Sequence, residues 1–179
     1  MKATGIVRRI DDLGRVVIPK EIRRTMRIRE GDPLEIYTDS QGEVIFKKYS
    51  QASEISLFTS IYADCIYKAI SMPIIITDRD KVISCAGLPK KDTIEKQITP
   101  DLENIMEKRA PFISPNGVEC INAVEGINKY AILAFPIISS GDIEGAVLLL
   151  KEGLSQKPSE SAVKLLSVAS SFLGKVLEN

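Results

Sequence analysis

The chain has 179 residues with 24 basic and 24 acidic side chains, so its formal net charge is zero. It contains no histidine, which excludes the usual general base, the Ser-His and Cys-His pairs and most catalytic zinc sites. Its three cysteines form no C-x-x-C pair, as is typical of buried thiols in a reducing compartment. No uncharged run is long enough to span a bilayer. We therefore expect a cytoplasmic protein that is not an enzyme, has no metal site and does not contact a membrane.

The neutral total hides a local imbalance of charge. Residues 1–29 carry nine Lys or Arg against three acids, whereas residues 51–179 carry thirteen basic and sixteen acidic groups. Positive charge concentrated in one small unit is typical of a nucleic-acid contact surface. The contrast predicts a DNA-binding domain over residues 1–50 and a second domain over residues 72–179. A linker helix over residues 51–71 is expected to join them and to pack with the second domain.

The first fifty residues predict a β-β-α-β-β unit. Apolar and polar residues alternate in the strands, Asp-Asp-Leu-Gly and Asp-Ser-Gln-Gly predict turns, and Pro19 suits the first turn of a helix because its missing N–H costs nothing there. A domain of this size without a metal or disulfide is marginal alone, so we expect an obligate oligomer. The expected helix covers residues 20–27, and the expected strands cover residues 4–10, 15–18, 34–38 and 43–49.

The short helix has one strongly basic face. At 100° per residue, Ile22 and Met26 share the inner side, and the opposite side carries Lys20, Arg23, Arg24 and Arg27. Arg8 and Arg15 flank the nearby turn, and a compact unit would gather all of these cations on one surface. Either this is a solvated charged face or a polyanion supplies the counter-charge. Duplex DNA fits better than a single strand, because the region offers almost no aromatic side chains for base stacking.

The remaining sequence predicts helices and a largely antiparallel sheet. Apolar residues at positions 55, 58, 62, 65 and 69 trace one face of a helix. That face either packs into the second domain or forms a seam between chains, with Ile55, Phe58 and Tyr62 as the oligomerisation candidates. The helix expected over residues 162–177 is the other expected oligomer surface. The other expected strands cover residues 73–77, 82–86, 130–138 and 143–150, and the other expected helices cover residues 100–109 and 162–177.

The segment GIVRRIDDLGRVVIPKEIRRTMRIREGDPLEIYTDSQGEVIFKKY closely resembles the DNA-binding domain of the AbrB family of transition-state regulators. The resemblance implies a dimeric swapped-hairpin β-barrel, in which two chains interleave their hairpins. It also implies that Arg8, Arg15, Arg23 and Arg24 contact DNA. Arg9, Lys20 and Arg27 are further candidates from the helix and turn geometry alone.

The whole layout resembles the members of that family that regulate sporulation, which carry a GAF domain after the barrel. The expected fold class is therefore α+β, an AbrB-type barrel followed by an α/β GAF-like domain with an antiparallel sheet. The resemblance implies a forespore transcription factor that activates some genes and represses others, binding double-stranded DNA as a dimer and assembling into a homotetramer. The second domain serves oligomerisation, the sensing of an unidentified small molecule, or both. An antitoxin-like interaction module built on the same barrel is the alternative function.

Overall fold

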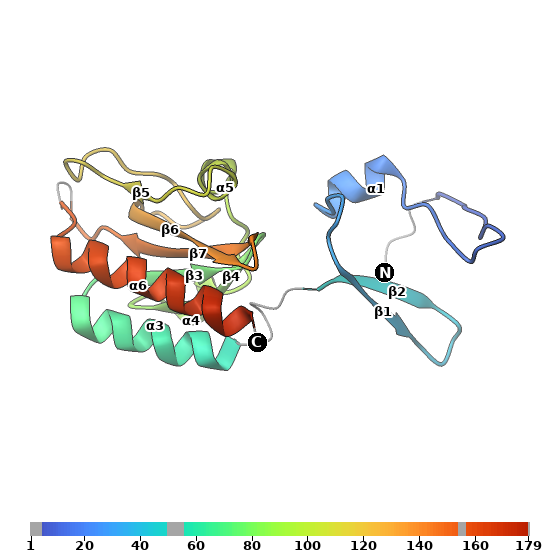
Figure 1. Cartoon of the computed structure of the whole chain (residues 1–179), viewed down its shortest axis with the longest axis horizontal. Helices are drawn as coiled ribbons and strands as arrows, with labels where there is room; N and C mark the ends of the chain where they lie inside the picture. Colours follow the sequence, from blue (N-terminus) through green and yellow to red (C-terminus); the bar gives the residue numbers. More distant parts are fainter. Residues whose placement is uncertain (1–4, 50–55, 154–156, 179) are drawn as a thin grey trace. The chain divides into compact units, whose positions relative to one another are not determined.

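The computed structural model describes residues 5–49, 56–153 and 157–178 (Figure 1). The chain divides into two compact units, Met1–Tyr49 and Ser50–Asn179. The first unit contains α1 (Lys20–Thr25), β1 (Leu34–Thr38) and β2 (Val44–Lys48). The second contains α3 (Ser56–Ile70), β3 (Ile74–Thr77), β4 (Val82–Ala86), α4 (Lys90–Thr93), α5 (Pro100–Glu107), β5 (Phe112–Ile113), β6 (Ala131–Ser139), β7 (Asp142–Leu150) and α6 (Glu160–Leu177).

The hairpin of the first unit is confirmed. β1 and β2 pair antiparallel from Leu34 opposite Lys48 to Thr38 opposite Val44. The turn between them is held by Asp39, whose Oδ1 accepts from the backbone N–H groups of Gln41 at 3.0 Å and Glu43 at 2.8 Å. This is the use of Asp that turn chemistry favours, so the turn and the register follow from the local sequence.

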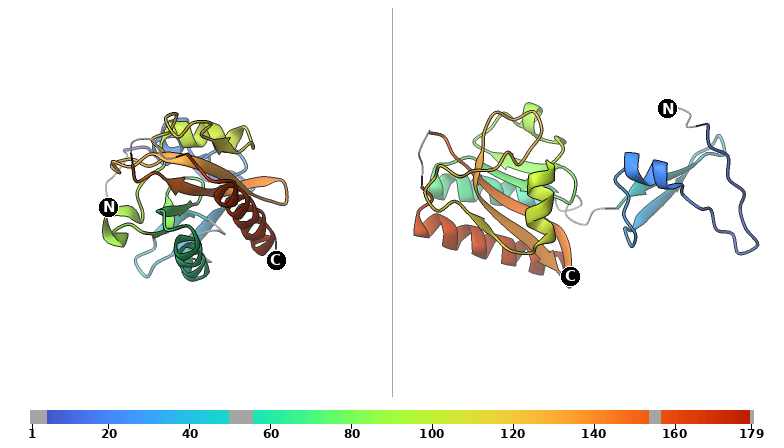
Figure 2. Two further views of the ribbon diagram at one scale, coloured as in Figure 1. Left: turned by 90° about the vertical axis from the view of Figure 1, so that its left-hand side faces the viewer. Right: turned by 90° about the horizontal axis from the view of Figure 1, so that it is seen from above.

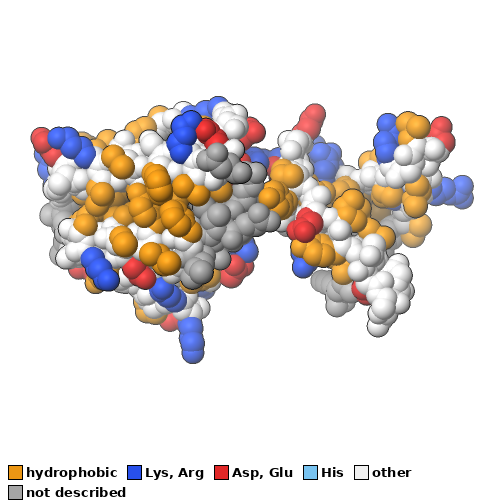
Figure 3. All heavy atoms as spheres, turned by 60° about the horizontal axis from the view of Figure 1, so that its bottom comes forward, with side chains coloured by type: hydrophobic (Ala, Val, Ile, Leu, Met, Phe, Trp, Pro, Cys, Tyr) orange, Lys and Arg blue, Asp and Glu red, His pale blue; other side chains and the backbone are white. Residues whose placement is uncertain are grey.

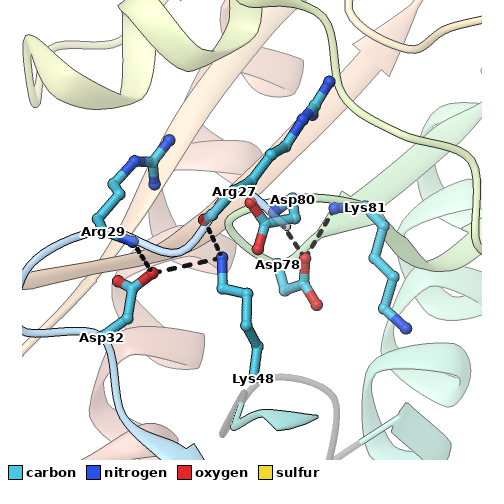
Figure 4. A network of polar contacts seen from close by, with 7 residues as sticks. All are labelled: Arg27, Arg29, Asp32, Lys48, Asp78, Asp80 and Lys81. Carbon is cyan, nitrogen blue, oxygen red and sulfur yellow. Dashed lines mark hydrogen bonds and ion pairs between the residues drawn. The ribbon is translucent and has the colours of Figure 1, made fainter. Parts of the chain in front are cut away.

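A polar network ties the end of α1 to the hairpin (Figure 4). Lys48 Nζ, on β2, donates to the carbonyl of Arg27 at 2.9 Å and lies 3.5 Å from Asp32 Oδ2. The same carboxylate oxygen accepts from the backbone N–H of Arg29 at 2.8 Å. The Asp32 side chain is only 2% exposed, so its charge depends on these donors. The network therefore fixes how the short basic helix is set against the hairpin.

The two strands predicted at residues 4–10 and 15–18 are wrong for the single chain, because the described residues 5–18 contain no strand. Only a turn forms, with the Asp11 N–H donating to the carbonyl of Arg15 and the Gly14 N–H to that of Asp11, both at 3.1 Å. The apolar side chains of this segment stay exposed, 86% for Val7 and 72% for Val17. A strand pattern needs a partner strand and a core to bury its apolar face, and within one chain this segment meets neither.

The second unit is built on a five-stranded antiparallel sheet with the order β4-β3-β7-β6-β5. Its central strands are buried on both faces, so the apolar runs in β3 and β7 are continuous rather than alternating. β6 and β7 form a hairpin whose two turn residues, Ser140 and Gly141, have φ of 48° and 88°. These positive values suit a two-residue turn that follows the twist of the strands. The four strands predicted in this region are confirmed.

Helices cover both faces of this sheet (Figures 1 and 2). α3 and α6 lie on one face, where Ile66, Leu166 and Leu173 join the core, and α5 covers the other through Leu102 and Met106. Two of the predicted helices of this unit, α5 and α6, begin at a capping side chain. Thr99 Oγ1 accepts from the Leu102 N–H before α5, and Ser159 Oγ accepts from the Ala162 N–H before α6. The short α4 and β5 were not predicted from the sequence.

Candidate nucleic-acid interface

The helix α1 carries the centre of the predicted basic face. It begins directly after the buried Pro19 and has no buried residue of its own. Lys20 and Arg24 are exposed, whereas Arg23 is half-buried. At this spacing the three cations share one side of the helix, as predicted from the sequence.

Arg27 differs from the prediction. The helix ends at Thr25, so Arg27 lies beyond it with a left-handed φ of 52°. Its position therefore cannot be derived from a helical wheel, and its backbone carbonyl is used by Lys48 instead. Met26, predicted to share the inner face with Ile22, is 56% exposed. The geometric argument that placed Arg27 on the helix face is wrong, although the residue remains a cation near the end of α1.

The turn of residues 11–14 carries the second group of cations, the exposed residues Arg8, Arg9 and Arg15. In Figure 1 and in the right-hand view of Figure 2, this turn extends away from α1 within the first unit. The single chain therefore does not bring the two predicted groups of arginines onto one surface. Any continuous basic face needs another chain to complete the unit.

Asp11 organises this turn. Its Oδ1 accepts from the N–H of Leu13 at 3.0 Å and from that of Arg15 at 2.7 Å, and its Oδ2 accepts from Arg15 Nε at 2.8 Å. These bonds to the backbone and guanidinium of Arg15 lower the pKa of Asp11 below its ordinary value. The carboxylate therefore stays ionised, and it holds one of the predicted DNA-binding arginines.

The oligomerisation candidates lie on the outer side of α3. The face that α3 buries against the sheet carries Thr59, Ala63 and Ile66, so the predicted face is a different one. Phe58 is 38% exposed there and Tyr62 is half-buried, while Ile55 lies outside the described residues. Core packing was therefore the wrong explanation for the period at positions 58, 62, 65 and 69.

The helix α6, the other oligomer surface expected from the sequence, contributes to the same patch. Phe172 packs against Phe58 and Tyr62, with ring centroids 5.9 and 5.4 Å away, and Phe58 stacks on Tyr62 at 6.0 Å. The exposed Ile61 and Val168 extend the patch. Figure 3 shows hydrophobic side chains gathered on this side of the second unit. Phe172 belongs to the apolar period predicted for residues 162–177, but the sequence did not show that α6 packs beside α3, which joins the two expected surfaces into one patch.

Two other kinds of site were sought in the part of the chain that the structure describes. No cluster of three or more His, Cys, Asp or Glu side chains there is arranged to hold a metal ion. None of the described helices combines the length and apolar character needed to cross a membrane. An open groove of about 270 Å³ lies between β5 and the start of α6, floored by Ile113 and Val163 and bordered by Lys157 and Lys164.

Comparison with known proteins assigns both units. A family model described as stage V sporulation protein T C-terminal, transcription factor, matches residues 54–178. The chain is also 47% identical over 181 residues to stage V sporulation protein T of Bacillus subtilis, covering 99% of each protein. The chain belongs to the stage V sporulation protein T family. Its first unit is 63% identical over 49 residues to the transition state regulatory protein AbrB of the same organism, covering 27% of this chain and 50% of AbrB.

The family model that matches residues 7–53 is that of the bacterial antitoxin MazE, described as antidote-toxin recognition. The second unit has the GAF fold. It is similar to the GAF domain of the Acinetobacter phosphoenolpyruvate-protein phosphotransferase, with a TM-score of 0.53 at 13% identity, over 73% of this chain and 84% of that one. The predicted combination of an AbrB-type first unit with a GAF-like second unit is confirmed. A folded GAF unit and a full-length likeness to a sporulation protein do not favour the antitoxin alternative.

Proposed function

We propose that this protein is a sporulation transcription factor that binds duplex DNA through its first unit. The observation that carries the proposal is its similarity to stage V sporulation protein T along 99% of both chains. The charge distribution supports it independently, since nine Lys or Arg against three acids lie within residues 1–29. In this proposal the protein acts in the cytoplasm of the forespore, activating some genes and repressing others. Its work is binding rather than catalysis.

A second copy of the chain completes the first unit in this proposal. Residues 5–18 have the alternation of strands but form no strand in the described structure, and Val7 and Val17 are exposed. Interleaving with the same segment of a second chain would pair these residues and bury Val7 and Val17. It would also bring the turn cations of one chain near an α1 helix. The DNA-binding set in this dimer is Arg8, Arg9, Arg15, Lys20, Arg23, Arg24 and Arg27.

The apolar patch on α3 and α6 joins such dimers into a tetramer in this proposal. Phe58, Ile61, Val168 and Phe172 are each between 38% and 61% exposed, and the rings of Phe58 and Phe172 lie in contact across α3 and α6. Contiguous exposed apolar surface of this kind marks interaction sites. Two linked barrels would engage paired DNA sites with a gain in effective concentration. A small-molecule ligand of the GAF unit remains a prediction from the fold alone.

The proposal is tested by fluorescence anisotropy with the full-length protein and a duplex selected by it from a random library. Binding should weaken as salt rises, with a log-log slope of about −0.9 for each phosphate contact. Arg23→Ala/Arg24→Ala should weaken binding and make the slope shallower. The matched control is Lys90→Ala/Lys91→Ala, which removes two cations from α4 in the second unit and should bind like the wild type.

The outcomes are distinct. Equal binding by wild type and the Arg23/Arg24 variant would move the DNA contact away from α1. Failure of the wild type to select any duplex, or binding without salt dependence, would overturn the DNA-binding proposal itself. The antitoxin alternative would then be the one to pursue.

A further inference from the structure

The two carboxylate oxygens of Asp11 have separate roles. Oδ1 accepts from the backbone N–H groups of Leu13 and Arg15 and so shapes the turn. Oδ2 accepts from Arg15 Nε at 2.8 Å and so acts only on the side chain. The neighbouring Asp12 has the same charge and is also exposed. The turn therefore carries two carboxylates, Asp11, which binds Arg15, and Asp12, whose substitution can serve as a control for that of Asp11.

The bond to Nε restricts how Arg15 can meet DNA. A guanidinium is planar, so fixing Nε against Asp11 sets the plane and reduces the freedom of the side chain. The Arg15 side chain is nevertheless 70% exposed. The donors that a ligand can reach are therefore the two terminal Nη groups, held side by side. Two parallel donors on a preset plane match the O6 and N7 acceptors of a guanine edge.

The charge of Asp11 favours a base over a phosphate. A phosphate that approaches Arg15 also approaches the carboxylate 2.8 Å from Nε, and like charges repel. A guanine edge is uncharged and avoids most of this penalty. The ion pair is also neutral as a unit, so it releases fewer condensed counterions than a lone arginine would on binding a phosphate.

Building on the proposed DNA-binding function, we infer that Asp11 is a positioning residue that makes Arg15 a reader of base edges instead of a phosphate contact. Asp11 thereby contributes to sequence specificity while lowering non-specific affinity. Arg8 and Arg9, on the other side of the turn, lack this carboxylate contact in the described structure. In this inference they contact the phosphate backbone of the DNA.

The deciding variant is Asp11→Asn, tested in the full-length protein. Asn keeps an oxygen that accepts from the Leu13 and Arg15 N–H groups. Opposite Nε it places an NH2 group, which cannot accept a hydrogen bond. Affinity is measured for the selected duplex and for a scrambled duplex of equal length and composition. The ratio of the affinity for the selected duplex to that for the scrambled duplex should fall about tenfold, because specific binding weakens and non-specific binding strengthens. The salt slope on the scrambled duplex should become steeper, and Asp12→Asn should leave the ratio unchanged.

A second variant, Arg15→Lys, keeps the inference falsifiable if Asp11→Asn is poorly folded. Arg15→Lys retains the charge but not the paired donors, and should lower the same ratio while keeping scrambled-duplex affinity. In an Arg15→Ala background, Asp11→Asn should have no additional effect on the ratio. An unchanged ratio in Asp11→Asn, or an equal loss on both duplexes, overturns the inference while leaving DNA binding intact. Absence of salt-sensitive binding by the wild type instead overturns the proposed function.

Discussion

The packing of α6 on the sheet depends on one glycine. At Gly174 the helix comes so close to β6 that a Cβ built there would lie 2.2 Å from the carbonyl oxygen of Ile138. This is about 1 Å short of the 3.3 Å that carbon–oxygen contacts usually keep. Both sides of the contact are backbone, so no side chain can rotate to relieve it. Gly174→Ala must therefore displace α6, which carries the fully buried Leu166 and Leu173.

The cost of this displacement can be estimated. Added bulk in a well-packed core costs about 1–3 kcal/mol, and a displacement of about 1 Å against backbone belongs at the upper end of that range. Because Ala favours the helix more than Gly does, the replacement also offsets about 1 kcal/mol of this cost. We therefore expect Gly174→Ala to lower the free energy of unfolding by about 1–2 kcal/mol. At roughly 4 °C per kcal/mol for a unit of this size, Tm should fall by about 4–8 °C.

Thermal and urea unfolding, followed by circular dichroism, measure this change. Gly153→Ala is the matched control, because no atom lies within 4 Å of its built Cβ. It should leave stability unchanged or raise it slightly, through the loss of freedom in the unfolded chain. If Gly174→Ala is as stable as the wild type, the close approach of α6 to β6 is not as described and the reasoning fails.

The remaining predictions concern the apolar patch and the half-buried carboxylate of Glu144. Phe58→Glu should halve the mass measured by light scattering while leaving DNA-binding dimers, and an unchanged mass would exclude this patch as the interface. In the same variant the exposed Cys65 thiol, on the same side of α3, should react faster with a thiol reagent than in the wild type, whereas the buried Cys85 should stay unreactive in both. Burial raises the pKa of Glu144, and the positive charge of Arg79 opposes this shift. The folded protein therefore binds the carboxyl proton of Glu144 more tightly than the unfolded chain does. For this reason the protein loses stability as pH rises through the raised pKa. Glu144→Gln should therefore be more stable than the wild type at pH 7 in urea unfolding, with the advantage vanishing below the unfolded value of 4.5; an advantage that persists there would point to packing instead of charge.

Much of the second unit could be predicted because its sequence patterns are strong and local. β3 and the second half of β7 are short runs of buried residues rich in Ile, Val and Leu, and their shortness favours a strand buried on both faces over a helix. α6 combines a long apolar period with Ser159 as its cap. The missed elements, α4 and β5, have four and two residues, too few to show any period. They form because the surrounding sheet and helices hold them in place.

The helical period in α3 was found correctly, but the sequence left open whether its apolar face packs into the second domain or between chains. Positions 58, 62 and 65 trace an apolar face, and a sequence cannot distinguish an apolar face that packs inside its own unit from one that packs elsewhere. The structure resolves this, because Thr59, Ala63 and Ile66 take the inner side. A helix apolar on two sides has more than one partner to satisfy.

The same reasoning explains why the strand pattern at residues 4–18 was not realised in a single chain. Alternation specifies which side chains need burial but does not specify which chain supplies the partner strand. The same limit applies to the predicted surface of cations. Their number and spacing predicted a nucleic-acid surface, but the turn that holds Arg15 and the helix that holds Arg24 lie apart within one unit. Asp11 is the exception, because its bonds to Arg15 close within four residues and need no second chain. The geometry of the Arg15 side chain is thus encoded locally, whereas the proposed surface that gathers these cations depends on the proposed dimer.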